Sequence, residues 1–182
     1  VRVMYSDNHV TLKKAAKLLS AAHQGSTPGV SKSNGIVERQ NQDIQDGLRA
    51  AINQAGLPAC FWAYAAPHYC HMANTQVDPD TGTSPHFARL GVECAAKRIP
   101  FGCGVFFIPS KTKYAVSPTN MRTQFGVFLG YKMGVGGKWS GDYYVADLYD
   151  FIDCSLHEDA DVDSFTHIRP HTTDTVDIPL AG

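Results

Sequence analysis

The sequence predicts an α/β segment that is followed by a small β-barrel or meander. Three observations favour this fold class. A short β-rich run opens the chain, apolar residues then recur at helical spacing, and an alternation with a period of two begins near Ile99. The 182 residues suffice for one domain or two small ones, and the hydrophobic fraction of 43% is close to the globular average.

The chain begins with a predicted strand over residues 1–6, which we expect to be buried. Apolar residues within 11–22 lie on one side of a predicted helix, and its other side carries three lysines, Lys13, Lys14 and Lys17. A solvated helix face explains these lysines most simply, and contact with DNA is the alternative. A short edge strand is expected at residues 22–25.

The sequence predicts a long helix over residues 34–55. It follows a loop at 25–33 that is rich in Gly and Ser. Gly56 suits the C-terminal cap, because glycine readily adopts the left-handed conformation that ends many helices. The apolar stripe of this helix consists of Val37, Ile44, Leu48, Ala51, Ile52 and Ala55.

Residues 58–75 have helical periodicity again, and Pro67 is expected to kink or break that helix. We interpret its aromatic face as core rather than as a platform for stacked bases, because aromatic residues at this spacing usually pack inside. A turn-rich stretch at 78–84 and a short helix at 85–90 follow. The expected apolar face is formed by Phe61, Trp62, Ala65, Ala66, Tyr69 and Met72.

The C-terminal half has short β runs separated by Pro- and Gly-rich turns, with residues 134–137 joining the last two runs. After about Asp153 the chain is acidic and has no periodicity, which predicts a disordered linker. We therefore expect three regions, namely 1–90, 91–155 and 156–182. The expected strands lie at 105–108, 124–129 and 142–146.

The net charge of −1 conceals an uneven distribution. Residues 1–132 carry 14 Lys and Arg against 7 Asp and Glu, a net charge of +7, whereas residues 133–182 carry 2 against 10, a net charge of −8. A basic body suits a polyanionic partner and an acidic tail suits a solvated linker, although chance clustering of charge is the alternative explanation.

The five cysteines are an odd number and include no C-x-x-C pair. This argues against a disulfide framework and for a reducing intracellular compartment. The sequence has no apolar run of about 18 residues, so neither a transmembrane helix nor a membrane partner is expected. His68 and His71 flank Cys70 on a predicted helix, where packed side chains are favoured over a zinc site.

Two carboxylates stand at positions that suit a site. Asp7 follows the first predicted strand, at the strand end where α/β sheets place their ligands. Glu38 lies in the first turn of the long helix, with 30 residues between the two. Taken alone, Glu38 is explained by helix electrostatics, because a carboxylate is stabilised near a helix N-terminus.

Asp7 and Glu38, with the residues around them, resemble the second and third members of the Asp, Asp, Glu triad of retroviral and retrotransposon integrases. Each of the motifs that continue this similarity is weak alone, but the ordered set resembles the integrase region of copia-type retrotransposon polyproteins over roughly residues 1–155. These motifs are Gly56-Leu57-Pro58, Phe61-Trp62, Asn74, Thr83-Ser84-Pro85, Phe101-Gly102-Cys103 and Phe128-Leu129-Gly130-Tyr131.

This resemblance implies the C-terminal portion of a ribonuclease H-like integrase core, mostly helical as truncated, followed by an SH3-like β-barrel. It also implies that Asp7 and Glu38 are catalytic carboxylates that bind Mg²⁺ or Mn²⁺ for DNA strand transfer. Lys32, Arg39 and Asn41 would then bind nucleic acid. The expected partner is DNA, with homo-oligomerisation left open, and the expected location is the nucleus or a virus-like particle.

The sequence departs from the family pattern in two places. His9 follows the Asp7-Asn8 pair, where the family usually has Gly. The first Asp of the triad, with its strands, would lie upstream of Val1, and the metal is expected only in the complete core. We therefore expect this chain to be a fragment of a longer product and to be inactive by itself.

Two further hypotheses remain beside the integrase. The first is a degenerate nucleic-acid- or protein-binding module without catalysis. The second is an unrelated α+β structural domain in which Asp7 and Glu38 are accidental. An upstream coding region that encodes a strand ending in Asp would favour the enzyme, and an absent or interrupted one would favour the degenerate module.

Overall fold

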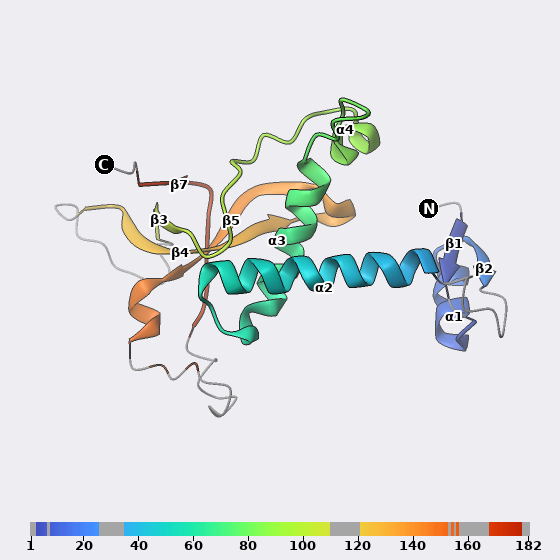
Figure 1. Ribbon diagram of the computed structural model, residues 1–182, viewed down its shortest axis with the longest axis horizontal. Helices are drawn as coiled ribbons and strands as arrows, with labels where there is room; N and C mark the ends of the chain where they lie inside the picture. Colours follow the sequence, from blue (N-terminus) through green and yellow to red (C-terminus); the bar gives the residue numbers. More distant parts are fainter. Residues whose placement is uncertain are drawn as a thin grey trace. The chain divides into compact units, whose positions relative to one another are not determined.

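The chain forms two compact units, Val1–Ile44 and Gln45–Gly182. The boundary falls inside α2 (Gly35–Ala55), so this helix contributes residues to both units (Figure 1). The domain boundaries that the sequence suggests near residues 90 and 155 stay predictions. The computed structural model describes residues 3–6, 8–25, 35–109, 121–152, 154, 156 and 168–179.

The N-terminal unit begins with a βαβ motif. Its two strands pair in parallel, with each residue of one opposite a residue of the other, and parallel neighbours need a crossover such as the helix between them. The expected helix and edge strand are confirmed. The helix ends at Leu18, because Ser20 adopts a left-handed conformation with φ of 51°. The three elements are β1 (Val3–Ser6), α1 (Val10–Leu18) and β2 (Ala22–Gly25).

The expectation that the first strand is buried is wrong. Val3 is 49% exposed and Tyr5 is 44% exposed in β1. A sheet of two strands offers little surface against which a strand can be covered, and among the described residues β1 pairs with β2 alone. The apolar composition of the run therefore predicted the strand correctly but overstated its burial.

The long helix is confirmed, as α2 spans Gly35–Ala55. Gly56 has a φ of 64°, the left-handed conformation expected of a residue that ends a helix. In the second unit, Ile52 is buried, and Leu48, Ala51 and Ala55 pack against the same apolar cluster.

The next helical region is divided into the 3₁₀ turn η2 (Ala59–Phe61) and the helix α3 (Trp62–Thr75). Of the two outcomes expected at Pro67, a kink or a break, the break is excluded, because α3 continues through this residue. Pro67 has no backbone N–H that could donate a hydrogen bond to the carbonyl of Ala63. Because Ala63 is exposed, water can donate to this carbonyl instead.

The buried face of this region agrees with the prediction in part, because Phe61 and Ala65 are buried as expected and Met72 packs against the core. Trp62 is 61% exposed, whereas Ala65, His68 and His71 are buried. The buried stripe is thus rotated by about one residue from the aromatic one. His68 can be buried because its Nε2–H donates to the carbonyl of Ile99 at 2.9 Å.

The short helix is confirmed as α4 (Pro85–Leu90), which follows the predicted turn-rich stretch. The Ser84 hydroxyl caps it by accepting a hydrogen bond from the Phe87 N–H at 3.0 Å. Gly91, with φ of 70°, ends it.

A five-stranded antiparallel sheet dominates the second unit, in the order β6-β5-β4-β3-β7. The three predicted β runs are confirmed as parts of β3, β4 and β5, and the short turn η3 (Val135–Gly137) joins the last two, as expected. A further 3₁₀ turn, η4 (Leu148–Phe151), follows β5. The strands are β3 (Gly104–Phe107), β4 (Gln124–Met133), β5 (Trp139–Asp147), β6 (His171–Thr173) and β7 (Val176–Asp177).

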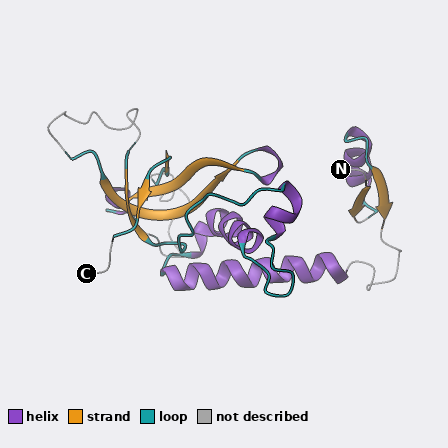
Figure 2. Ribbon diagram, turned by 90° about the horizontal axis from the view of Figure 1, so that it is seen from above, coloured by secondary structure: helices purple, strands orange, loops and turns teal. Residues whose placement is uncertain are grey.

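This sheet is curled like half of a barrel. β6 and β7 lie at opposite edges of the strand order, yet only Asp174 and Thr175 connect them. The two edges can be bridged by so short a connection only if the sheet curls until they come close, as the strands drawn in orange in Figure 2 do. Helices with a curled antiparallel sheet are compatible with an α/β segment plus an SH3-like fold.

The prediction of a disordered linker at 156–182 is therefore wrong for residues 168–179. They contribute both edge strands, and Val176 is 1% exposed in the core of the sheet. An acidic stretch can still form strands where a few β-branched side chains, such as Val176, pack into the apolar core.

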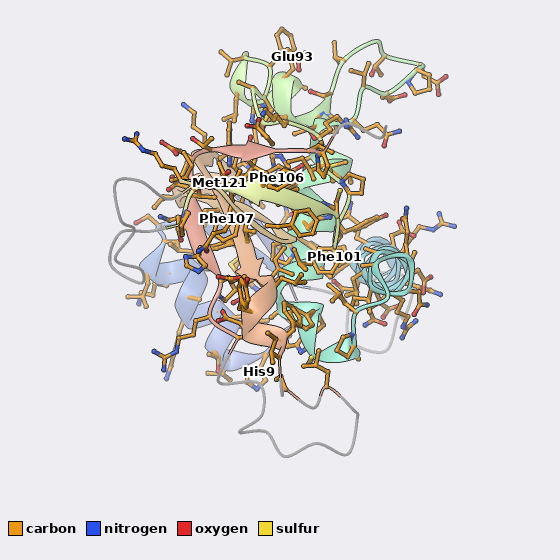
Figure 3. The ribbon with its side chains drawn as sticks, turned by 90° about the vertical axis from the view of Figure 1, so that its left-hand side faces the viewer. His9, Glu93, Phe101, Phe106, Phe107 and Met121 are labelled. Carbon is orange, nitrogen blue, oxygen red and sulfur yellow. The ribbon has the colours of Figure 1, made fainter. Side chains whose placement is uncertain are left out.

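The middle of β4 is covered on both faces of the sheet, which explains its unbroken apolar run. Phe128 belongs to the cluster inside the curl, and Leu129 to the cluster under α2 and α3. Neighbouring residues of a strand point to opposite faces. In β3 the same alternation leaves Phe106 42% exposed while Phe107 is fully buried, and both are labelled in Figure 3.

Candidate functional site

The first part of the predicted site is the carboxyl-terminal edge of the β1–β2 pair. Asp7 itself lies outside the described residues, but its neighbours Ser6 and Asn8 are described. Ser6 lies opposite Gly25, so both parallel strands end at the same edge. A Cβ atom on Gly25 would collide with the Asn8 side chain, so this amide covers the end of β2. This edge is where α/β sheets place ligands.

His9 stands where the resembled integrases usually have Gly, and the structure shows that glycine is not needed here. Its φ of −61° and ψ of 136° are an extended conformation that any residue adopts. The His9 Nδ1 accepts a hydrogen bond from the Thr11 N–H at 3.4 Å and so caps α1. The conformation at this position therefore does not require glycine.

The second part of the predicted site is the first turns of α2. Glu38 lies in the first turn, as expected, and its side chain is exposed, as are those of Arg39 and Asn41. Glu38 and Asn41 are three residues apart, so they share one face of the helix. The remaining predicted nucleic-acid ligand, Lys32, lies outside the described residues.

The prediction that Asp7 and Glu38 share a metal ion stays a prediction, because the first of them is not described. Within the described part of the chain, no three His, Cys, Asp or Glu side chains are grouped so that they could hold a metal ion. None of the helices in that part is both long and apolar enough to cross a membrane.

The two histidines of α3 pack in the second unit. The ring of His71 lies 3.9 Å from that of Tyr131, and its Nε2 lies 3.9 Å from the Cys94 Sγ. The Tyr131 hydroxyl in turn donates to the Lys97 carbonyl at 2.8 Å. Burial lowers the pKa of His71 to about 4, and the nearby charges of His68, His86 and Arg98 act in the same direction. Both histidines are thus packed residues of a helix, as the sequence favours.

Acidification is expected to destabilise the second unit through His71. The folded pKa is about 4 against the ordinary 6.5, so between these values the unfolded chain binds a proton that the folded chain does not. Stability should be complete above pH 6.5 and fall by about 1–3 kcal/mol as the pH drops to 4. Urea unfolding, followed by tryptophan fluorescence at several pH values, measures this. In His71→Phe the pH dependence should be smaller, and an unchanged dependence would exclude His71 as its cause.

Sequence reasoning gave no role to Lys97, which the structure places against the C-terminal strand β7. Its ammonium group donates to the Val176 carbonyl at 2.7 Å and to the Asp177 carboxylate at 3.0 Å. The signal that could have located its partners is the run of β-branched residues after Pro170, which is typical of a strand. These residues are Thr172, Thr173, Thr175, Val176 and Ile178.

The chain combines an α/β segment, made of the βαβ motif and the following long helix, with a curled β-sheet. Of its two candidate carboxylates, the structure describes Glu38. Over 112 residues, or 60% of its length, this chain is 26% identical to the retrovirus-related Pol polyprotein from transposon TNT 1-94 of Nicotiana tabacum. The matched region spans 8% of that polyprotein. No protein-family model matches the sequence. The chain is therefore related to a retrotransposon Pol polyprotein.

Proposed function

We propose that this chain is part of the integrase region of a copia-type retrotransposon polyprotein. It would comprise the C-terminal part of a ribonuclease H-like core and an SH3-like domain. The observation that carries the proposal is the similarity to a Pol polyprotein. The positions of the two carboxylates in the sequence support it as well. Asp7 follows a parallel strand that ends beside β2, and Glu38 opens the next long helix.

In the full-length protein the function would be DNA integration by metal-dependent strand transfer. Asp7 and Glu38 would supply metal-binding carboxylates, for which Mg²⁺ or Mn²⁺ is the fitting ion, because these ions prefer oxygen ligands. Lys32, Arg39 and Asn41 would contact nucleic acid. The exposure of Glu38, Arg39 and Asn41 supports this assignment, since their side chains are accessible to a large ligand. The protein would act in the nucleus or in a virus-like particle.

The proposal is tested with a chain that is extended upstream to include the strands and the first Asp that the integrase resemblance implies. This longer chain should join DNA ends in the presence of Mg²⁺ or Mn²⁺, whereas the 182-residue chain should show no joining. Absence of joining by the longer chain, with DNA binding retained, would favour the degenerate binding module. Joining by the 182-residue chain alone would contradict our placement of the active site.

DNA binding is expected to tolerate changes of DNA sequence and to weaken strongly with salt, because the basic excess of residues 1–132 would act by releasing counterions from phosphates. Lys13, Lys14 and Lys17 are exposed on α1. Replacing all three by Gln should reduce the slope of log K against log salt by about 2 to 3 if each contacts a phosphate. Fluorescence anisotropy titrations at several salt concentrations measure the slope.

Lys138→Gln is the matched control, since Lys138 is exposed but belongs to the acidic part of the chain. It should change the slope little. Tight binding that is equal at low and high salt would contradict the electrostatic account. Binding that survives the neutralisation of Lys13, Lys14 and Lys17 together with Lys32 and Arg39 would contradict it as well.

A further inference from the structure

The C-terminal strand β7 occupies a well-defined slot at the edge of the curled sheet. Phe106 of β3 lies opposite Asp177, and Phe107 lies opposite Val176. The Val176 side chain is 1% exposed and enters the core, whereas the Asp177 side chain is 70% exposed. The slot therefore accepts an extended segment in which an apolar residue is followed by an acidic one.

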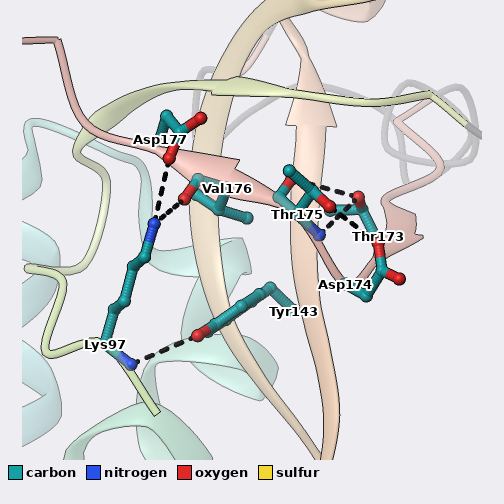
Figure 4. Close-up of polar contacts among 7 residues, drawn as sticks. All are labelled: Lys97, Tyr143, Thr173, Asp174, Thr175, Val176 and Asp177. Atoms are coloured by element: carbon teal, nitrogen blue, oxygen red, sulfur yellow. Dashed lines mark hydrogen bonds and ion pairs between the residues drawn. The ribbon is translucent and has the colours of Figure 1, made fainter.

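Lys97 contacts both residues of that segment (Figure 4). Its ammonium group binds the backbone carbonyl of Val176 at 2.7 Å and the carboxylate of Asp177 at 3.0 Å. Its own backbone N–H donates to the Tyr143 hydroxyl at 3.2 Å, which fixes the lysine to β5. The slot thus has a cation that is held in place by the same sheet.

The segment that fills the slot carries its own turn. The Thr173 hydroxyl donates to the Thr175 carbonyl at 3.2 Å and accepts from the Thr175 N–H at 3.3 Å. The Thr175 hydroxyl donates to the Asp174 carboxylate at 2.9 Å. β6 and β7 are therefore joined by contacts within the segment itself, and they can move as a pair without remaking this turn.

The connection that leads to this segment is long. η4 ends at Phe151 and β6 begins at His171, so residues 152–170 lie between them. Nineteen residues can span up to about 60 Å when extended. Among those of them that the structure describes, none belongs to a helix or a strand. Chain length thus permits the same segment to reach either its own sheet or that of another molecule.

We propose that residues 168–179 are exchanged between two copies of this chain, so that the slot formed by β3, Lys97 and Tyr143 receives the segment of the other copy. Every contact made within one chain is then remade between two chains. The exchange loses only the high effective concentration at which a segment meets the sheet of its own chain. A rise in protein concentration offsets this loss. Two residue pairs join β7 to β3 and three join β6 to β5, so release of the segment breaks the pairing of two short strands.

Two variants that reverse the charge of Lys97 or of Asp177 test this proposal. Both side chains are largely exposed, at 55% and 70%, so the variants Lys97→Glu and Asp177→Lys leave the core unchanged. Each variant alone brings like charges together in its own slot. When the two variants exchange segments in an equal mixture, both slots hold opposite charges. Lys97 of one chain meets Asp177 of the other, and the introduced Glu at position 97 meets the introduced Lys at position 177.

The two variants are mixed at high concentration, one of them labelled with nitrogen-15, and native mass spectrometry counts the dimers. We expect mixed dimers to exceed those of a wild-type mixture on the order of tenfold. The double variant Lys97→Glu/Asp177→Lys is the control, because it restores the pair within one chain and should behave like wild type. A mixed-dimer fraction no higher than that of the wild-type mixture would show that each segment closes only its own sheet and would overturn the proposal.

Discussion

Replacing Glu38 by Gln in the upstream-extended chain is expected to lower DNA joining by orders of magnitude while DNA binding is nearly retained. Gln keeps the size and the hydrogen-bonding capacity of Glu but lacks the charge that holds a metal ion. Glu38 is exposed in the first turn of α2, so the change should not disturb packing. Single-turnover joining assays and DNA titrations measure the two effects. Asp7→Asn should behave in the same way.

Asp43→Asn is the matched control on the same helix. Asp43 is an exposed carboxylate five residues beyond Glu38 and therefore projects from a different side of α2. This variant should join DNA at nearly the wild-type rate. If Glu38→Gln retained joining, or if Asp43→Asn lost as much of it, the assignment of Glu38 to the chemistry would be wrong.

Phe128→Ala is expected to lower the free energy of unfolding of the second unit by about 3–5 kcal/mol. Phe128 is fully buried in β4, and its ring lies 5.3 Å from that of Tyr131 and 6.0 Å from that of Tyr143. Truncation removes these contacts and leaves a cavity. Tryptophan fluorescence during urea unfolding suits the measurement, because both tryptophans, Trp62 and Trp139, belong to this unit.

Phe106→Ala serves as the control for this prediction. It deletes the same side chain from the neighbouring strand β3, where Phe106 is 42% exposed and stacks edge-on against Phe125 at 5.3 Å. Its loss should be clearly smaller, about 1 kcal/mol. Equal losses for the two variants would contradict the assignment of the main core to the inside of the curl.

The sequence predicted those elements whose signal is local. α2 has an apolar stripe over many turns, α4 has a Ser84 cap with Pro85 at its start, and β4 has an apolar run between turns. The position of Glu38 in a first helical turn was predictable for the same reason. The roles of Asp7 and Lys32 stay predictions, because both residues lie outside the described ranges.

The errors occurred where distant residues decide the outcome. His68 is buried because it donates to Ile99, a residue 31 positions later in the chain. Val176 is ordered because β3, far upstream, offers an edge, and Lys97 binds its carbonyl. No periodicity within the acidic C-terminal stretch contains this information, and β propensity depends strongly on such surroundings.

A paramagnetic titration tests most directly whether Asp7 and Glu38 form one metal site. Mn²⁺ is added to the nitrogen-15-labelled, upstream-extended chain, and the loss of amide signals is followed by NMR. If the two carboxylates do form one site, the signals of residues 7 and 38 disappear together, at the same Mn²⁺ concentration and before those of the acidic residues 133–182. Loss of signal at only one of the two residues, or first in the acidic stretch, would contradict a shared site.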